Sequence, residues 1–259
     1  MDANFSRHAV IARHLEDVRW LARAPIPCVV VTNPLLLEGR DASAYLYYIV
    51  SAYSSLPDWT LFMHAHERAW HHALYSQLAS MLVAPYAAGV GFLPVNHDGE
   101  GNLMLSRGRL PPAELDCAEF ARLRAELLGL AGCGSPAQYP PCAQFWVHRD
   151  RITARPRAFY ERLLQVLTDR THPLLRRRAV REGNPNRTVH NYFLEGHWHL
   201  IFGEPEKYEL PCRRFSQLPF ITGRIVPHKD GSCVGSSCRR VSVGHSIEHM
   251  RLRRPSRTA

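Results

Sequence analysis

Short apolar runs alternate with stretches of helical periodicity along the first part of the chain. The runs at residues 9–12, 27–32 and 59–63 are uninterrupted, and each predicts a strand. Between them, apolar side chains recur at helical spacing in residues 13–21 and 42–53. An uninterrupted apolar strand is buried on both faces, which is typical of a parallel sheet covered by helices. The alternation of strands and helices therefore predicts an α/β fold.

The pattern continues less regularly toward residue 205. We predict further strands at residues 89–95 and 143–148, helices at 72–80, 117–130, 157–167 and 190–202, and one helical turn at 149–153. Residues 97–112 are rich in Gly, Asn and Pro, and we expect a long surface loop there, which could act as a lid. Residues 1–205 are therefore expected to form one α/β domain, with a mostly parallel central sheet flanked by helices.

The positive charge is concentrated in the last part of the chain. Residues 206–259 carry 11 Lys and Arg against 4 Asp and Glu, whereas residues 1–205 carry 21 against 19. We interpret residues 206–259 as a basic low-complexity tail that is disordered. The nearly neutral body argues against a nucleic-acid partner for the folded domain.

The sequence contains no candidate membrane span, because no apolar run reaches 18 residues. Residues 1–7 also lack the apolar core of a signal peptide. We therefore expect a soluble, cytoplasmic chain by default. A targeting segment on a longer gene product would instead leave the secretory lumen open.

The seven cysteines are scattered and contain no Cys-x-x-Cys pair. An odd, scattered set is typical of reduced and mostly buried thiols. Cys28 lies in an apolar run and is expected in the core. The alternative is one disulfide between Cys233 and Cys238 in the basic tail.

The densest group of chemically useful side chains follows the strand at residues 59–63. His64, His66, His71 and His72 lie within nine residues, just where ligands bind in open α/β sheets. Imidazoles separated by two residues on a strand project to the same side, so we predict His64 and His66 as ligands of Mn²⁺ or Zn²⁺. The alternatives are a general base, a phosphate-binding imidazolium or ordinary structural histidines.

Polar side chains near the starts of the first two helices form a second group. Glu16 and Asp17 follow the first strand and could bind a nucleotide-sugar, or they could simply favour the positive end of a helix. Arg40 precedes a predicted helix, and an Arg at a helix N-terminus makes an anion site. Arg13 lies beside the same predicted site. Trp70 could stack on a sugar ring or pack in the core.

Three further candidates lie in the second half of the chain. Glu195 and His199 share one face of the predicted helix at residues 190–202, and a carboxylate there could deprotonate an acceptor hydroxyl. The alternative for Glu195 is a structural pair with Arg or His. Gln144, on the strand at residues 143–148, could bind a substrate hydroxyl.

Five blocks of this sequence resemble, in order, the family called domain of unknown function 3431. The resemblance is carried by residues 9–21, 39–49, 56–62, 142–160 and 194–203, including Gly39-Arg40-Asp41 and Leu194-Glu195-Gly196-His197-Trp198. The layout is in turn similar to GT-A-type nucleotide-sugar glycosyltransferases. That similarity implies a Rossmann-like nucleotide half, a metal motif after the central strand and an acceptor half. The sequence departs from the GT-A pattern, because His64-Ala65-His66 stands where Asp-x-Asp is expected.

The resemblance and the candidate residues together lead to three hypotheses. The first is a transferase that moves a sugar from a nucleotide-sugar to a hydroxyl acceptor, with a divalent metal, Mn²⁺ or Zn²⁺, as cofactor. The second is a metal-dependent hydrolase or oxygenase that uses the histidine cluster. The third is a non-catalytic carbohydrate-binding protein. The expected partner is a nucleotide-sugar or another small anionic substrate.

Overall fold

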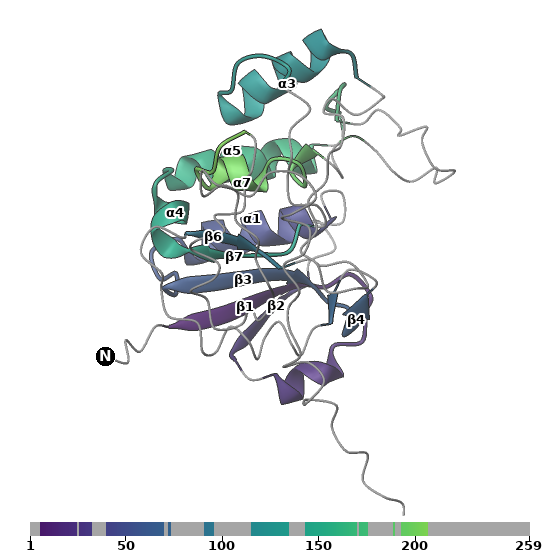
Figure 1. Ribbon diagram of the computed structural model, residues 1–259. Coiled ribbons are helices and arrows are strands. Elements are labelled where there is room, and N and C mark those ends of the chain that lie inside the picture. The colour runs from purple at the N-terminus through teal and green to yellow at the C-terminus, as the bar shows by residue number, and fades with distance from the viewer. Residues whose placement is uncertain are drawn as a thin grey trace, which may run out of the picture.

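A mixed α/β domain is seen in the computed structural model, which describes residues 6–24, 26–32, 40–69, 72–73, 91–95, 115–134, 143–169, 171–175, 189 and 193–206. A five-stranded sheet lies at its centre, and the helices are stacked on it with α3 outermost (Figure 1). Within these ranges, no helix is both long and apolar enough to cross a membrane.

The sheet has the strand order β2-β1-β3-β7-β6. Its strands are β1 (Arg7–Ala12), β2 (Cys28–Val31), β3 (Trp59–His64), β6 (Phe92–Pro94) and β7 (Phe145–His148). β1 pairs in parallel with β2 and β3, whereas β7 pairs antiparallel with β3 and β6. Strand β7 therefore runs against the other four. Two of the four pairings are parallel and two are antiparallel, so the sheet is mixed.

All five predicted strands are present. Those inside the sheet are buried, which explains why they have apolar runs that can be recognised in the sequence. The side chains from Ala9 to Ile11 and from Leu61 to Met63 are fully buried, because β1 and β3 lie inside the sheet. The expectation of burial on both faces is wrong for β2. Val29 and Val30 are 36% and 38% exposed, because β2 is an edge strand.

A small second sheet replaces the start of one predicted helix. Strands β4 (Arg68–Ala69) and β5 (His72–Ala73) pair antiparallel. The helix predicted from residue 72 is therefore wrong at its first two residues. The rest of that segment, the loop at 97–112 and the tail beyond residue 206 lie outside the described residues.

Four predicted helical segments are confirmed: α1 (Arg40–Ala52), α3 (Cys117–Leu128), α4 (Arg149–Thr153) and α5 (Arg157–Thr168). Helix α3 begins with a capping box in which Asp116 accepts from the backbone of Glu119 and the Glu119 side chain accepts in return. It ends at Gly129, whose φ of 69° favours a residue without Cβ.

The helix predicted at residues 13–21 is wrong over most of its length. Only a 3₁₀ helix, η1 (Arg19–Arg23), forms, and it begins near the end of the predicted range. Before it, the Glu16 carboxylate accepts hydrogen bonds from the backbone N–H groups of His14 and Leu15. Such local bonds give the backbone an alternative to a helix.

The last predicted helix, at residues 190–202, is interrupted. Residues 194–197 form turns, and α7 covers only Trp198–Ile201. Gly196 lies within the interruption, and glycine weakens a helix interior. Glu195 and His199 therefore do not share a face of one continuous helix, as the sequence had suggested.

An aromatic cluster joins the sheet to two helices on one face. Tyr45 of α1 lies 4.9 Å from Phe62 of β3 and 5.9 Å from Trp198 of α7, and Trp198 lies 5.4 Å from Phe145 of β7, measured between ring centroids. We call Tyr45, Phe62, Phe145 and Trp198 the aromatic cluster. Its tilted ring pairs have the spacing at which aromatic contacts stabilise a core.

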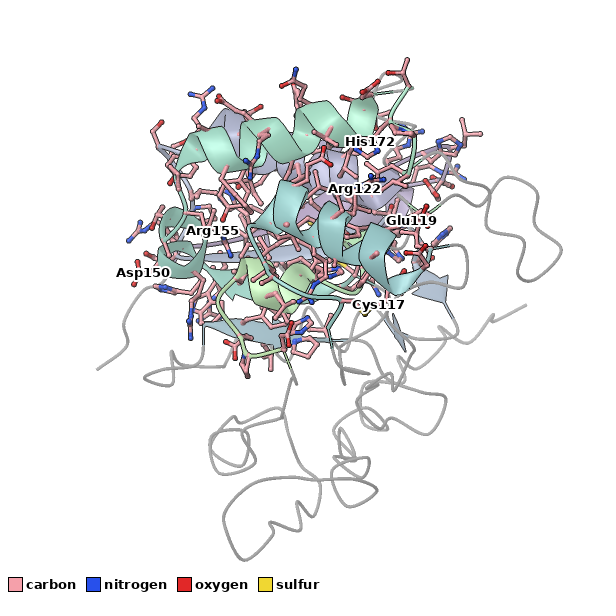
Figure 2. All side chains as sticks on the ribbon, turned by 90° about the horizontal axis from the view of Figure 1, so that it is seen from above. Cys117, Glu119, Arg122, Asp150, Arg155 and His172 are labelled. Carbon is pink, nitrogen blue, oxygen red and sulfur yellow. A yellow bond between two sulfur atoms is a disulfide. The ribbon has the colours of Figure 1, made fainter. Side chains whose placement is uncertain are left out.

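Helix α5 packs on α1 and is also hydrogen-bonded to α3. Tyr53, just after α1, donates a hydrogen bond from its hydroxyl to the carbonyl of Arg155, just before α5. Arg162 of α5 donates to the carbonyl of Leu127 in α3. His172, which follows α5 and is labelled beside α3 in Figure 2, lies 3.3 Å from the carboxylate of Glu126.

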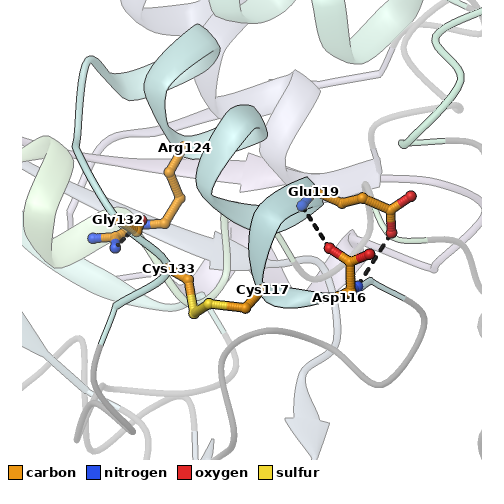
Figure 3. Close-up of a disulfide and its surroundings, with 6 residues drawn as sticks. All are labelled: Asp116, Cys117, Glu119, Arg124, Gly132 and Cys133. Atoms are coloured by element: carbon orange, nitrogen blue, oxygen red, sulfur yellow. Dashed lines mark hydrogen bonds between the residues drawn. A yellow bond between two sulfur atoms is a disulfide. The ribbon is translucent and has the colours of Figure 1, made fainter.

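A disulfide joins the two ends of the α3 segment, contrary to the prediction of reduced thiols. Cys117 begins α3 and Cys133 lies in the loop after it, with a Cα–Cα distance of 5.3 Å. Arg124 steadies that loop by donating to the carbonyl of Gly132 (Figure 3). Disulfides form and persist in oxidising surroundings.

The remaining cysteines only partly follow the prediction. Cys28 is a free thiol, but it is half-buried instead of fully in the core. Burial raises the pKa of the Cys28 thiol to about 11, so the thiol stays protonated at neutral pH. The other four lie outside the described residues: Cys142, Cys212, Cys233 and Cys238.

We expect removal of the Cys117–Cys133 disulfide to destabilise the domain. A closed loop with a sequence separation of 16 restricts the unfolded chain and stabilises the fold by roughly 3 kcal/mol. The double variant Cys117→Ser/Cys133→Ser should lose about this amount in urea unfolding, and dithiothreitol should have the same effect on the wild type. Cys28→Ser is the matched control and should respond to dithiothreitol as the wild type does. Equal stability of the double variant and the wild type would contradict the prediction.

Candidate functional site

The carboxyl ends of β1 and β3 lie side by side at one edge of the sheet. The two strands are parallel and in register, with Ala12 opposite His64. The chain passes from β1 to β2 on one side, and then to β3 on the other side of β1. In open α/β sheets such a change of side creates a crevice where ligands bind. We call Glu16, Asp41, His64 and His66, which gather there, the carboxyl-edge site.

His64 and Asp41 form the first pair of this site. The Nε2 atom of His64, the last residue of β3, lies 3.3 Å from Oδ2 of Asp41 in the first turn of α1. The His64 side chain is 17% exposed, so it is sheltered but open to solvent. From the sequence alone, Asp41 was included only in the Gly39-Arg40-Asp41 block of the family resemblance. Its position just after Arg40, at the start of the helix between two predicted strands, was the one available signal.

His66 and Glu16 form the second pair. The Nε2 atom of His66 lies 3.8 Å from Oε1 of Glu16, and the rings of His64 and His66 are 6.5 Å apart. Trp20 joins the loop after β1, which contains Glu16, to this edge of the sheet. Its indole N–H donates a hydrogen bond to the carbonyl of Ala65 at 3.0 Å. The described contacts therefore bring together residues from three separate parts of the sequence.

Glu16 is held in its charged form. Burial raises its pKa, but backbone hydrogen bonds and the nearby His66 outweigh that effect, and the pKa is lowered overall. The same carboxylate accepts from the N–H groups of His14 and Leu15 at 2.6 Å and 3.1 Å. Glu16 thus shapes the loop and also supplies a negative charge to the site.

Gln144 supports the site from the neighbouring strand. Its side chain is almost fully buried, and its Oε1 accepts a hydrogen bond from the backbone N–H of His64 at 3.1 Å. Ala143, just before it, has a left-handed φ of 43°, which is uncommon for alanine. This turn precedes Gln144, whose side chain hydrogen-bonds the last residue of β3. The role that the structure shows for Gln144 is therefore to support the backbone of His64. Its predicted contact with a substrate hydroxyl stays a prediction.

Arg13 and Asp17 lie on the loop after β1. The Nε atom of Arg13 donates to the carbonyl of Glu16 at 2.9 Å, and its side chain is exposed. Asp17 pairs with Arg19, at 2.7 Å between Oδ2 and Nε. This hydrogen bond lowers the pKa of Asp17. Asp17 therefore serves the turn into η1, whereas Arg13 lies beside Glu16.

Two predicted substrate-binding side chains cannot be placed. Arg40 is the first residue of α1, so its backbone lies at this edge, but its side chain is outside the described residues. Trp70 and His71 are also outside them.

Metal binding stays a prediction for His64 and His66. The two ion pairs described above join each imidazole to a different carboxylate. Among the described residues, no group of three or more His, Cys, Asp or Glu side chains could hold a metal ion. A zinc site usually has at least three protein ligands. Any further ligand would come from the part of the chain that is not described.

The predicted catalytic pair, Glu195 and His199, lies around α7. Glu195 is half-buried in the turns before the helix. His199 is buried, and its Nε2 lies 3.4 Å from the carbonyl of Glu206. Burial lowers the pKa of His199 to about 4, so it is neutral at physiological pH. The contacts that we describe for His199 do not include the carboxyl-edge site, and both catalytic roles remain predictions.

The chain belongs to the family described as "Protein of unknown function (DUF3431)". The family model matches residues 11–94 and 117–216, which include all four residues of the carboxyl-edge site. This confirms the family resemblance seen in the sequence. The match also extends beyond residue 205, the predicted end of the domain. No curated protein and no solved structure matches the chain.

We expect Gln144→Leu to destabilise the domain. The substitution removes the acceptor for the His64 backbone N–H, and an unpaired buried donor costs about 1–3 kcal/mol. Urea unfolding measures the loss. The control is Gln165→Leu on the exposed face of α5, which should change stability by less than about 0.5 kcal/mol. Similar small effects of both substitutions would show that Gln144 does not support this edge.

The domain should lose stability in acid because of its buried histidines. His199 has a folded pKa of about 4 against the usual 6.5, so below pH 6.5 the unfolded chain binds a proton that the folded chain does not. Stability is complete above pH 6.5 and falls as the pH drops toward 4, by about 2 kcal/mol at pH 5.

The variant His199→Gln tests this effect, because glutamine keeps a polar side chain but does not titrate. The difference in unfolding free energy between pH 7.5 and pH 5 should shrink relative to the wild type. Replacement of the exposed His14 by Gln should leave that difference unchanged. If the change in unfolding free energy between pH 7.5 and pH 5 were the same in His199→Gln as in the wild type, His199 would not be a cause of the acid sensitivity.

Proposed function

We propose that this domain transfers a sugar from a nucleotide-sugar donor to a hydroxyl acceptor at the carboxyl-edge site. The observation that carries the proposal is the meeting of the ends of β1 and β3 with the start of α1. Two imidazole–carboxylate pairs gather at that point, Asp41–His64 and Glu16–His66. It is also the side of the sheet on which open α/β folds bind nucleotides.

The strand order adds support for this proposal. Three adjacent parallel strands, β2, β1 and β3, form one half of the sheet, and β7 is inserted in reverse beside β3. We propose that this arrangement is GT-A-like, with the nucleotide over the parallel half. The acceptor would then lie toward β7 and α7.

The loop after β1 and the start of α1 would hold the nucleotide. Carboxylates suit ribose hydroxyls because they accept two hydrogen bonds, and Glu16 and Asp17 are the candidates. Arg13 and Arg40 would balance the diphosphate, together with the backbone N–H groups at the start of α1. Trp70 would stack on the sugar.

The chemical step requires charge balance and one proton acceptor. The acceptor oxygen attacks the anomeric carbon, the bond from that carbon to the diphosphate oxygen breaks, and the diphosphate leaves with the bonding electrons. His64 and His66 would offset its charge, directly or through Mn²⁺ or Zn²⁺. Glu195 is the proposed base for the acceptor proton, with His199 four residues later as the second catalytic candidate.

We expect a nucleotide-sugar to stabilise the wild type in a thermal-shift panel of UDP-glucose, UDP-N-acetylglucosamine and GDP-mannose, with and without Mn²⁺ or Zn²⁺. At a concentration of 100 times Kd, ligand binding stabilises the native state by about 2.7 kcal/mol. His64→Ala should reduce the shift. His8→Ala, near the opposite end of β1, is the control and should keep it.

The other outcomes select the alternatives. A shift with metal alone would favour a metal-dependent hydrolase or oxygenase. A shift with free glucose or mannose, and none with a nucleotide, would favour a carbohydrate-binding protein. A flat panel for every nucleotide-sugar would count against the transferase.

A further inference from the structure

Tyr45 carries a buried hydroxyl that no described residue hydrogen-bonds. The side chain is fully buried in α1, and among the described residues its Oη has no hydrogen-bond partner. Most buried polar side-chain atoms in proteins are paired, and an exception needs an explanation. Other buried side chains here also have an unpaired atom, but Tyr45 differs because its neighbour Asp41 belongs to the carboxyl-edge site.

The geometry of α1 places the Tyr45 side chain on the side of Asp41. Residues four apart share one face of a helix, so Tyr45 lies on the same face as Asp41. Side chains of a helix lean toward its N-terminus, which here is the end beside His64. The ring packs against Phe62 of β3 and Phe145 of β7. Both residues lie close to the carboxyl end of β3.

The phenol is restricted to donating a hydrogen bond. Burial, and then the negative charge of Asp41, raise the pKa of Tyr45 well above its usual value. The hydroxyl therefore keeps its proton at neutral pH. The Asp41 carboxylate nearby can only accept hydrogen bonds when ionised.

We propose that the Tyr45 hydroxyl donates a hydrogen bond to a hydroxyl of the bound sugar, which in turn donates to Asp41. A group between a donor and a carboxylate must accept one hydrogen bond and donate another, as a sugar hydroxyl does. A phosphate oxygen would meet the charge of Asp41, and a metal ion would not accept from the phenol. The assignment rests on the proposed function and names the sugar as the part of the donor that Tyr45 contacts.

Tyr45→Phe tests this assignment, because it removes only the hydroxyl. Without ligand, Tm should be unchanged or higher, since no hydrogen bond within the fold is lost. Calorimetry should show that Kd for UDP-glucose, UDP-N-acetylglucosamine or GDP-mannose, whichever the wild type binds, rises about tenfold. Kd for the matching UDP or GDP should stay the same. Tyr47→Phe, on the same helix but 42% exposed, is the control and should change neither.

Each opposite result has a distinct meaning. A Tm lowered by several degrees without ligand would show that the hydroxyl is paired within the fold, and would overturn the assignment whatever binds. If Tyr45→Phe weakened binding of the nucleotide and of the nucleotide-sugar equally, or weakened neither, the assignment of Tyr45 would be overturned. The proposed function would remain intact. A wild type that binds none of UDP-glucose, UDP-N-acetylglucosamine and GDP-mannose would overturn the proposed function, and this assignment with it.

Discussion

The parallel pairing of β1 with β3 is the constraint on which the rest of the structure depends. Its register sets Ala12 opposite His64, so the loop after β1 and the residues after β3 meet at one edge. The same pairing fixes where α1 must begin, because α1 packs on β1 and β3. The contact of Asp41 with His64 follows from this geometry. Loss of the register by one residue would turn every buried side chain of β1 to the other face.

The strands were well predicted from the sequence, because a buried strand is recognisable from its own run of apolar residues. The runs that became β1 and β3 are apolar except for Thr60, as expected for strands inside a sheet. The edge position of β2 could not be predicted, because the apolar run at 27–32 has the same composition as an interior strand. Only strand order decides that Val29 and Val30 face solvent.

The failures arise where one side chain competes with a periodic pattern or acts over a long distance. Glu16 accepts hydrogen bonds from two backbone N–H groups, which competes with the helix that the apolar periodicity favours at residues 13–21. The Cys117–Cys133 bond depends on the turn after α3, so spacing alone gave no sign of it. The site was partly predictable, since His64, His66 and Glu16 follow strands. Asp41 was missed as a member because its partner lies 23 positions away in the sequence.

The charges of the carboxyl-edge site limit what can bind there. Glu16 and Asp41 supply two negative charges, which are balanced when both imidazoles are protonated and uncompensated when both are neutral. A diphosphate would add further negative charge, which the proposed Arg13 and Arg40, a divalent cation or protonated histidines would have to offset. A sugar hydroxyl is neutral in either case. The proposed contact with Tyr45 and Asp41 is therefore compatible with both forms of the site, and it orients the sugar independently of how the diphosphate is neutralised.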